Sequence, residues 1–140
     1  MTDLATVAQA QRNADTVRRM YQAERERDID AWTALWNPEG RQTFAFGGPP
    51  PVQGIEALRA STAEKFATRG PVTIADAVWA TLDPHVVFAI ADVSIVFDPA
   101  RGPFQAQLWC RFDFDDDGRI LVHEEVLDTA MAASFFAGDN

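Results

Sequence analysis

The stretch FDFDDDGRILVHEE, from Phe112 to Glu125, decides between two folds. Its three alternating aspartates, Gly118 and Glu124 match the calcium-loop pattern D-x-D-x-D-G-x5-E at every specified position. A working calcium loop needs a helix on each side and usually a second loop as its partner, and the sequence offers no second loop. Asp-Gly is also common at the turn of an antiparallel hairpin. The stretch therefore favours two β-strands joined by an acidic turn over a metal site.

Strand-like runs continue back from this hairpin through the second half of the chain. They are rich in Val, Ile, Phe and Trp and are separated by turn residues. The runs cover residues 72–81, 85–97, 104–114 and 119–128. Apolar residues at three- and four-residue spacings predict helices over 4–21, 29–36 and 55–68, with a short strand at 42–46 and a tail helix at 129–137. Helices first and consecutive strands afterwards predict an α+β fold, with the helices packed on an antiparallel sheet.

Length and composition exclude several classes of function. The 140 residues predict one domain, 1–140, and a 47% hydrophobic content is typical of a globular chain. A formal charge of −9 argues against binding to nucleic acid or to an anionic membrane. Cys110 is the single cysteine, which excludes an internal disulfide and a multi-cysteine metal site. No signal-peptide pattern or membrane-length apolar run is present, so a cytoplasmic location is expected.

Alternation along the last strand places His123 and Glu125 on one face, with Leu121 and Leu127. If that face meets the helices, Glu125 is a carboxylate in an apolar cavity, where desolvation raises its pKa and makes it a usable general acid or base. His123 could exchange protons with it, or could be a satisfied wall residue. The opposite face of this strand also carries apolar residues: Ile120, Val122 and Val126. These predict a homodimer through the open side of the sheet.

Three stretches resemble one superfamily: TVRRMYQAERERDIDAWTALW (16–36), PPPVQGIEALRAS (49–61) and FDFDDDGRILVHEEVLD (112–128). They are similar to the nuclear transport factor 2-like proteins, and among these to SnoaL-like polyketide cyclases, ketosteroid isomerases, limonene epoxide hydrolases and phenazine-biosynthesis A/B proteins. The resemblance implies N-terminal helices packed in a strongly curved antiparallel sheet, a cone-shaped α+β barrel. This scaffold carries many chemistries, so the fold does not name the reaction.

The resemblance transfers to few site residues. Glu125 matches the acid/base glutamate of the phenazine proteins, and Asp128 matches a carboxylate near the end of the last strand in the epoxide hydrolases and cyclases. Asp128 can equally be the cap of the tail helix. The ketosteroid isomerase base falls on Phe44 and its oxyanion-hole acid on Cys110, which argues against steroid isomerisation by that mechanism.

Two further polar residues are candidates. Asp92 interrupts an apolar strand and requires a partner, and Tyr21 could donate a hydrogen bond to a substrate oxygen or be an ordinary core residue. The predicted catalytic set is thus Glu125, Asp128, Asp92, His123 and Tyr21. The predicted apolar lining, in which the tryptophans could instead be core residues, is Trp32, Trp36, Phe44, Phe46, Leu108 and Cys110.

The sequence thus predicts an enzyme that needs no cofactor or metal and acts on a small, apolar, oxygenated molecule. Its carboxylate chemistry would be of the isomerase, cyclase, dehydratase or epoxide hydrolase type. The alternative is a protein on the same scaffold that binds a small ligand without turnover.

Overall fold

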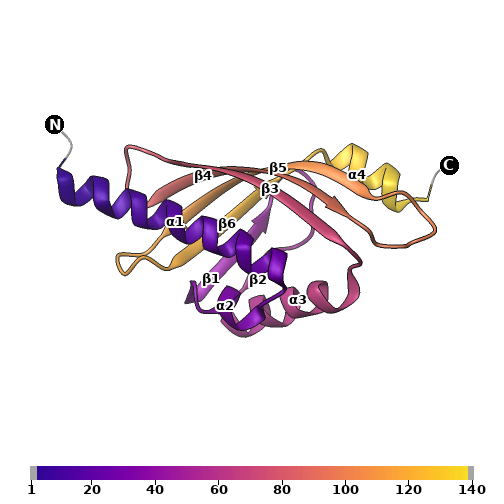
Figure 1. Ribbon diagram of the computed structural model, residues 1–140, viewed down its shortest axis with the longest axis horizontal. Coiled ribbons are helices and arrows are strands. Elements are labelled where there is room, and N and C mark those ends of the chain that lie inside the picture. The colour runs from indigo at the N-terminus through magenta and orange to yellow at the C-terminus, as the bar shows by residue number, and fades with distance from the viewer. Residues whose placement is uncertain (1–2, 139–140) are drawn as a thin grey trace.

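One sheet organises the molecule in the computed structural model, which describes residues 3–138. Along the chain the elements are α1 (Leu4–Glu26), α2 (Ile29–Thr33), β1 (Trp36–Phe44), β2 (Val52–Gln53), α3 (Ile55–Thr68), β3 (Val72–Ala80), β4 (Val86–Ile95), β5 (Phe104–Phe114), β6 (Ile120–Val126) and α4 (Thr129–Phe136). The strand order in the sheet is β2-β1-β6-β5-β4-β3. Helices α1 to α3 lie along one face, and α4 packs at the far end of the sheet (Figure 1).

The α+β class is confirmed, and the sheet differs in one respect from the antiparallel barrel expected. Strands β3 to β6 form an antiparallel meander, but β1 pairs with β6 in parallel. The chain reaches β3 from β1 through the crossover helix α3, and three successive reversals then bring β6 back alongside β1 in the same direction. The sheet is therefore mixed, and it is open because β2 and β3 lie at its two edges.

Burial alternates along β5 and separates its two faces. Phe104, Cys110, Phe112 and Phe114 are buried on the side of the helices, whereas Trp109 is 58% exposed on the other side. Residues Ala14, Val17 and Met20 of α1 complete this core with no exposed surface. Each fully buried large side chain contributes about 1.5–3 kcal/mol, so this shared core fixes α1 against the sheet.

A β-bulge at the start of β6 changes the face of one residue. Phe114 pairs with Ile120 but Asp113 pairs with Val122, which leaves Leu121 as an extra residue in β6. Ile120 is therefore fully buried in the core, and its predicted position on the open face is wrong. Beyond the bulge the expected alternation holds, and Cys110 on the inner face pairs with Glu125.

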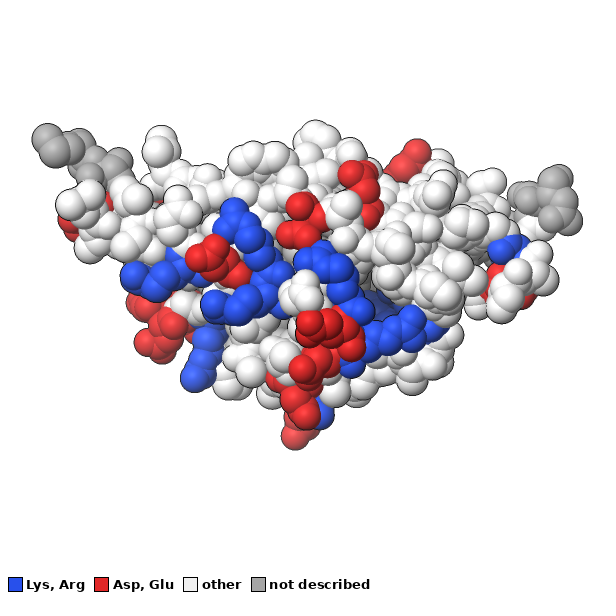
Figure 2. Space-filling model, viewed as in Figure 1, with Lys and Arg blue, Asp and Glu red and all other residues white. Residues whose placement is uncertain are grey.

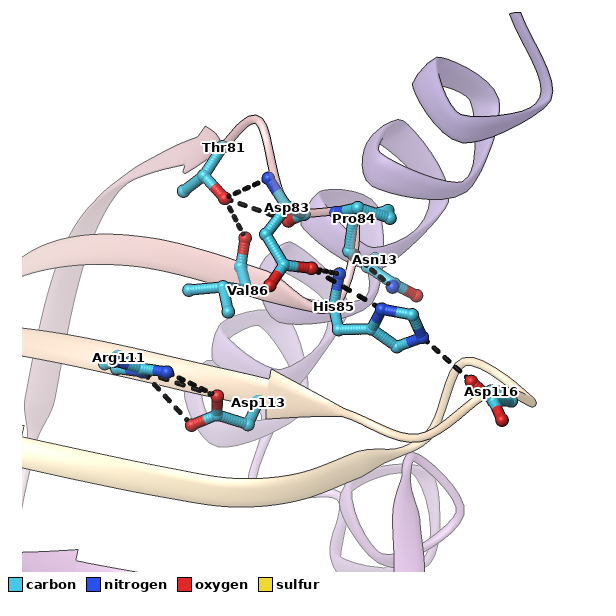
Figure 3. Close-up of polar contacts among 9 residues, drawn as sticks. All are labelled: Asn13, Thr81, Asp83, Pro84, His85, Val86, Arg111, Asp113 and Asp116. Atoms are coloured by element: carbon cyan, nitrogen blue, oxygen red, sulfur yellow. Dashed lines mark hydrogen bonds and ion pairs between the residues drawn. The ribbon is translucent and has the colours of Figure 1, made fainter. Parts of the chain in front are cut away.

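The acidic turn is a hairpin turn, as predicted. Asp115 Oδ1 accepts hydrogen bonds from the backbone N–H groups of Asp117 and Arg119, and Gly118 takes a φ of +82°. Figure 3 shows the neighbouring Asp116 bonded to His85 at 2.9 Å, at the turn that precedes β4. The stretch that matched the calcium pattern thus connects two strands, and the carboxylates of Asp113, Asp115 and Glu124 accept hydrogen bonds from protein groups.

None of the helices in residues 3–138 is both long and apolar enough to cross a membrane.

Candidate active site

A cavity of about 460 Å³ lies between the inner face of the sheet and helices α1, α3 and α4. A volume of this order holds a small organic molecule. Apolar side chains form most of its wall, among them Phe44, Phe66, Val93, Ile95, Phe104 and Leu108. On the face shown in Figure 2, basic side chains gather over α1 and α3, where the surface is hollowed.

Glu125 extends from the inner face of β6 into this cavity. Burial raises the pKa of its carboxyl above the ordinary value of 4.5, and the positive charges of Lys65 and Arg69 oppose that rise. No group of residues 3–138 donates a hydrogen bond to the Glu125 carboxylate. The inward orientation predicted from alternation is therefore confirmed, and the carboxyl is available to a ligand.

His123 lies two residues before Glu125 on the same wall and is buried. Its ring stacks on Phe112 with centroids 4.4 Å apart, and its Nδ1 lies 3.3 Å from the side-chain Nε2 of Gln42. Burial, with Lys65 nearby, lowers the pKa of His123 to about 3, so the ring is neutral at physiological pH. Because the Gln42 amide donates to Nδ1, the ring proton is assigned to Nε2, which has no partner within residues 3–138.

Tyr21 supplies a second polar group from α1. Its ring packs edge-on against Phe112, the residue lines the cavity, and the buried hydroxyl lies beside the Cys110 thiol with no stronger hydrogen-bond partner in the described chain. Burial, reinforced by the neighbouring Cys110, raises the pKa of Tyr21 far above 10. The hydroxyl is therefore protonated and can donate a hydrogen bond, or accept one, at the cavity wall.

Cys110, His123 and Glu125 present ligand atoms that all lie within 4.8 Å of one another. Such a set could hold a metal in principle. However, burial raises the pKa of the Cys110 thiol well above 9, which keeps it protonated, and the charge of Lys65 acts on both His123 and Glu125. These groups suit proton donation and acceptance better than the binding of a cation.

The family follows from comparison with known proteins. A family model described as the SnoaL-like domain matches residues 17–123. The chain belongs to the SnoaL-like domain family. The resemblance to SnoaL-like proteins expected from the sequence is thereby confirmed. No curated protein matches the chain.

Solved structures share the architecture of this SnoaL-like domain across nearly the whole chain. A phenazine biosynthesis-related protein from Pseudomonas aeruginosa has a TM-score of 0.79 and 16% identity, covering 97% of this chain and 92% of its own. A proposed polyketide cyclase from Xanthomonas campestris pv. campestris has a TM-score of 0.75 and 19% identity, covering 87% of this chain and 94% of its own. An epoxide hydrolase of the LEH-like type from M. tuberculosis has a TM-score of 0.70 and 17% identity, covering 91% of this chain and 92% of its own. At these identities the likeness shows the fold alone.

The SnoaL-like domain brings together only part of the site predicted from sequence. Of the predicted residues, those that line the cavity are Tyr21, Phe44, Leu108, His123 and Glu125. Cys110 is buried beside Tyr21 and Glu125 but does not line the cavity. Trp32 and Trp36 pack on each other in the core, with centroids 5.1 Å apart, as the alternative interpretation held.

Three predicted site residues lie elsewhere. Asp128 accepts a hydrogen bond from the backbone N–H of Met131, so it caps α4 and does not line the cavity. Asp92 is exposed on the outer face of β4, where Gln107 donates to it at 3.1 Å, so its predicted place in the pocket is wrong. Phe46 is 78% exposed in the loop after β1 and is no part of the lining.

Glu24, Lys65 and Arg69 are charged lining residues that sequence reasoning missed. Burial, followed by the charge of Glu125, raises the pKa of Glu24 to about 7. Lys65 lies in the last turn of α3 and Arg69 is the C-cap of that helix, and burial lowers the pKa of each. Only their spacing in the sequence could have pointed to these residues. Glu24 follows Tyr21 by three residues and Arg69 follows Lys65 by four, which are the spacings of neighbours on one side of a helix.

Proposed function

We propose that this SnoaL-like domain is a cofactor-independent enzyme in which Glu125 moves a proton on a small, apolar, oxygenated substrate. The reaction belongs to the isomerase, cyclase, dehydratase or epoxide hydrolase type. The observation that carries the proposal is the Glu125 carboxyl, which opens into a largely apolar cavity without a hydrogen-bond partner in residues 3–138. Such burial brings the pKa of a carboxyl toward neutrality, where a general acid or base is most effective.

His123 and Tyr21 supply the complementary chemistry in this proposal. A proton transfer next to a carbonyl, or the opening of an epoxide, leaves negative charge on an oxygen. The Nε2–H of His123 has no partner in the described chain, and the Tyr21 hydroxyl has only the weakly bonding Cys110 thiol beside it, so both neutral donors can stabilise that charge. Because the lining is largely apolar, these hydrogen bonds act at a lower dielectric constant than in water, where they are stronger.

The test compares wild type with Glu125→Gln on a panel of apolar epoxides, enones and polyketide-type esters. Loss of a general acid or base lowers turnover by about 10²–10⁴-fold. Glu124→Gln is the matched control, because Glu124 is the preceding residue of β6 but faces outward and accepts a hydrogen bond from Thr43. Full turnover by Glu125→Gln would exclude the mechanism. Ligand binding without turnover by the wild type would instead support the non-catalytic alternative.

A further inference from the structure

Two cations face the cavity without a counter-ion in contact. Lys65 and Arg69 form no ion pair within 4.0 Å and no side-chain hydrogen bond in the part of the chain that the structure describes. Lys65 Nζ lies 5.7 Å from the ring centroid of Phe44 instead. The Arg69 guanidinium lies 5.3 Å from the ring centroid of Phe97. Both rings belong to the cavity wall, so both cations stand over the space that a ligand would occupy.

Cations elsewhere on α3 and on α1 are paired with carboxylates. Arg59, on α3, contacts Asp30 at 2.6 Å, and Arg25, on α1, contacts Asp76 at 2.7 Å. Removing a cation from water costs free energy unless an opposite charge or hydrogen bonds compensate. Aromatic faces compensate only in part, by about 0.5–2 kcal/mol. Lys65 therefore retains donor capacity that an anion in the cavity would satisfy.

Neighbouring carboxyls do not remove the excess of positive charge at this wall. Glu24 and Glu125 are the acidic residues that line the cavity, and neither lies within 4.0 Å of Lys65 or Arg69. Burial also keeps Glu24 partly protonated near pH 7. Arg27, which adds a third cation to the lining, uses its guanidinium to bond the backbone carbonyls of Phe66, Arg69 and Gly70.

We propose that Lys65 and Arg69 form an anion subsite, and that the substrate is an apolar molecule carrying a carboxylate or a comparably acidic oxygen. Naming the ligand as a substrate rests on the proposed function; the subsite itself does not. The acidic group would bind at the α3 wall with the apolar body against Phe104 and Leu108. This orientation directs the remaining oxygens of the molecule to the sheet wall, where Glu125 lies.

A pair of fluorescent probes separates charge from shape. Anilinonaphthalene sulfonate carries an anionic group, and phenylnaphthylamine has the same ring skeleton without it. The wild type should bind the anionic probe more tightly than the neutral one. Lys65→Met and Arg69→Met should each weaken the anionic probe at least about tenfold, as loss of a charge-assisted hydrogen bond does, and change the neutral probe less than about twofold. Binding of the neutral probe also shows that the cavity of each variant is folded.

Two further variants complete the experiment. Arg59→Met removes the same charge from the same helix outside the cavity and should leave both probes unchanged. Lys65→Arg should retain the anionic probe, since it keeps the charge. Equal binding of both probes by the wild type, or equal losses of both in Lys65→Met and Arg69→Met, would overturn the subsite. Glu125→Gln should keep or strengthen anionic binding even where turnover is abolished, so failure of the catalytic proposal and failure of the subsite give different results.

Discussion

Replacing Glu24 by glutamine should stabilise the protein progressively, relative to wild type, as the pH rises from 4 to 8. In the folded protein burial raises the pKa of Glu24 to about 7, whereas in the unfolded chain it returns to about 4.5. The folded state therefore holds this proton more tightly than the unfolded state. The stability that the protonated carboxyl contributes is complete below pH 4.5 and is lost as the pH rises through 7.

The size of the effect follows from the two pKa values. Each unit between them corresponds to about 1.4 kcal/mol, so ionisation of Glu24 costs the folded state about 3 kcal/mol by pH 8. Because glutamine cannot ionise, the free energy of unfolding of Glu24→Gln minus that of wild type should increase by up to about 3 kcal/mol between pH 4 and pH 8. This figure is an upper bound, because the Glu24 side chain is partly exposed and solvent screens its charge.

Urea unfolding at pH 4, 6 and 8 measures this difference directly. Glu26→Gln is the control, because Glu26 is exposed on the same helix and does not line the cavity. The reasoning would be refuted if the Glu24→Gln difference stayed constant across this range. It would also be refuted if the difference changed in the opposite direction, which would mean that Lys65 and Arg69 outweigh burial.

Three further predictions concern the rest of the molecule. The ring resonances of His123 should show no titration between pH 8 and pH 5, because burial lowers its pKa to about 3; a midpoint near 6 in NMR would contradict this. Arg27→Met should lower the free energy of unfolding by about 1 kcal/mol, because three hydrogen bonds to the end of α3 are lost from an exposed side chain; an unchanged urea midpoint would oppose it. We propose a homodimer through the outer face of the sheet, where Trp79, Phe88 and Trp109 are exposed; Trp109→Glu should dissociate it in light scattering, and a monomeric wild type at micromolar concentration would exclude it.

Period-two alternation along the last strand predicted the inward position of Glu125, on the same face as His123 and Leu127. The same reasoning failed for Ile120, since a bulge inserts one residue without any mark in the apolar pattern. It failed for Asp92 because β4 also carries apolar residues, Phe88 and Ile90, on its outer face. The sequence pattern therefore gave no sign that Asp92 lies on the exposed side. The order of helices and strands was predicted correctly without knowing individual faces, because apolar residues change from a three- or four-residue spacing in the helices to alternation in the strands.

The other charged residues of the site were beyond sequence reasoning for a different reason. Glu24 lies on α1, and Lys65 and Arg69 lie at the C-terminal end of α3, so only the packing of these helices on the sheet brings their charges around the cavity that holds Glu125. In the sequence alone each of the three belongs to the ordinary charged margin of an amphipathic helix. Their pKa shifts come from burial and from one another, and both causes arise only on folding.

The two walls of the cavity are electrostatically linked, and this gives ligand binding a way to adjust the proposed catalyst. Lys65 and Arg69 oppose the rise in the pKa of Glu125 that burial causes. An acidic group bound between these cations would offset their charge at Glu125 and displace water from the cavity. Both changes favour the protonated carboxyl, so an anionic ligand should raise the pKa of Glu125, and by reciprocity protonation of Glu125 should tighten anion binding. On this argument the substrate that fits the α3 wall also prepares Glu125 to act as an acid, whereas a neutral ligand of the same shape leaves more of it ionised and able to accept a proton.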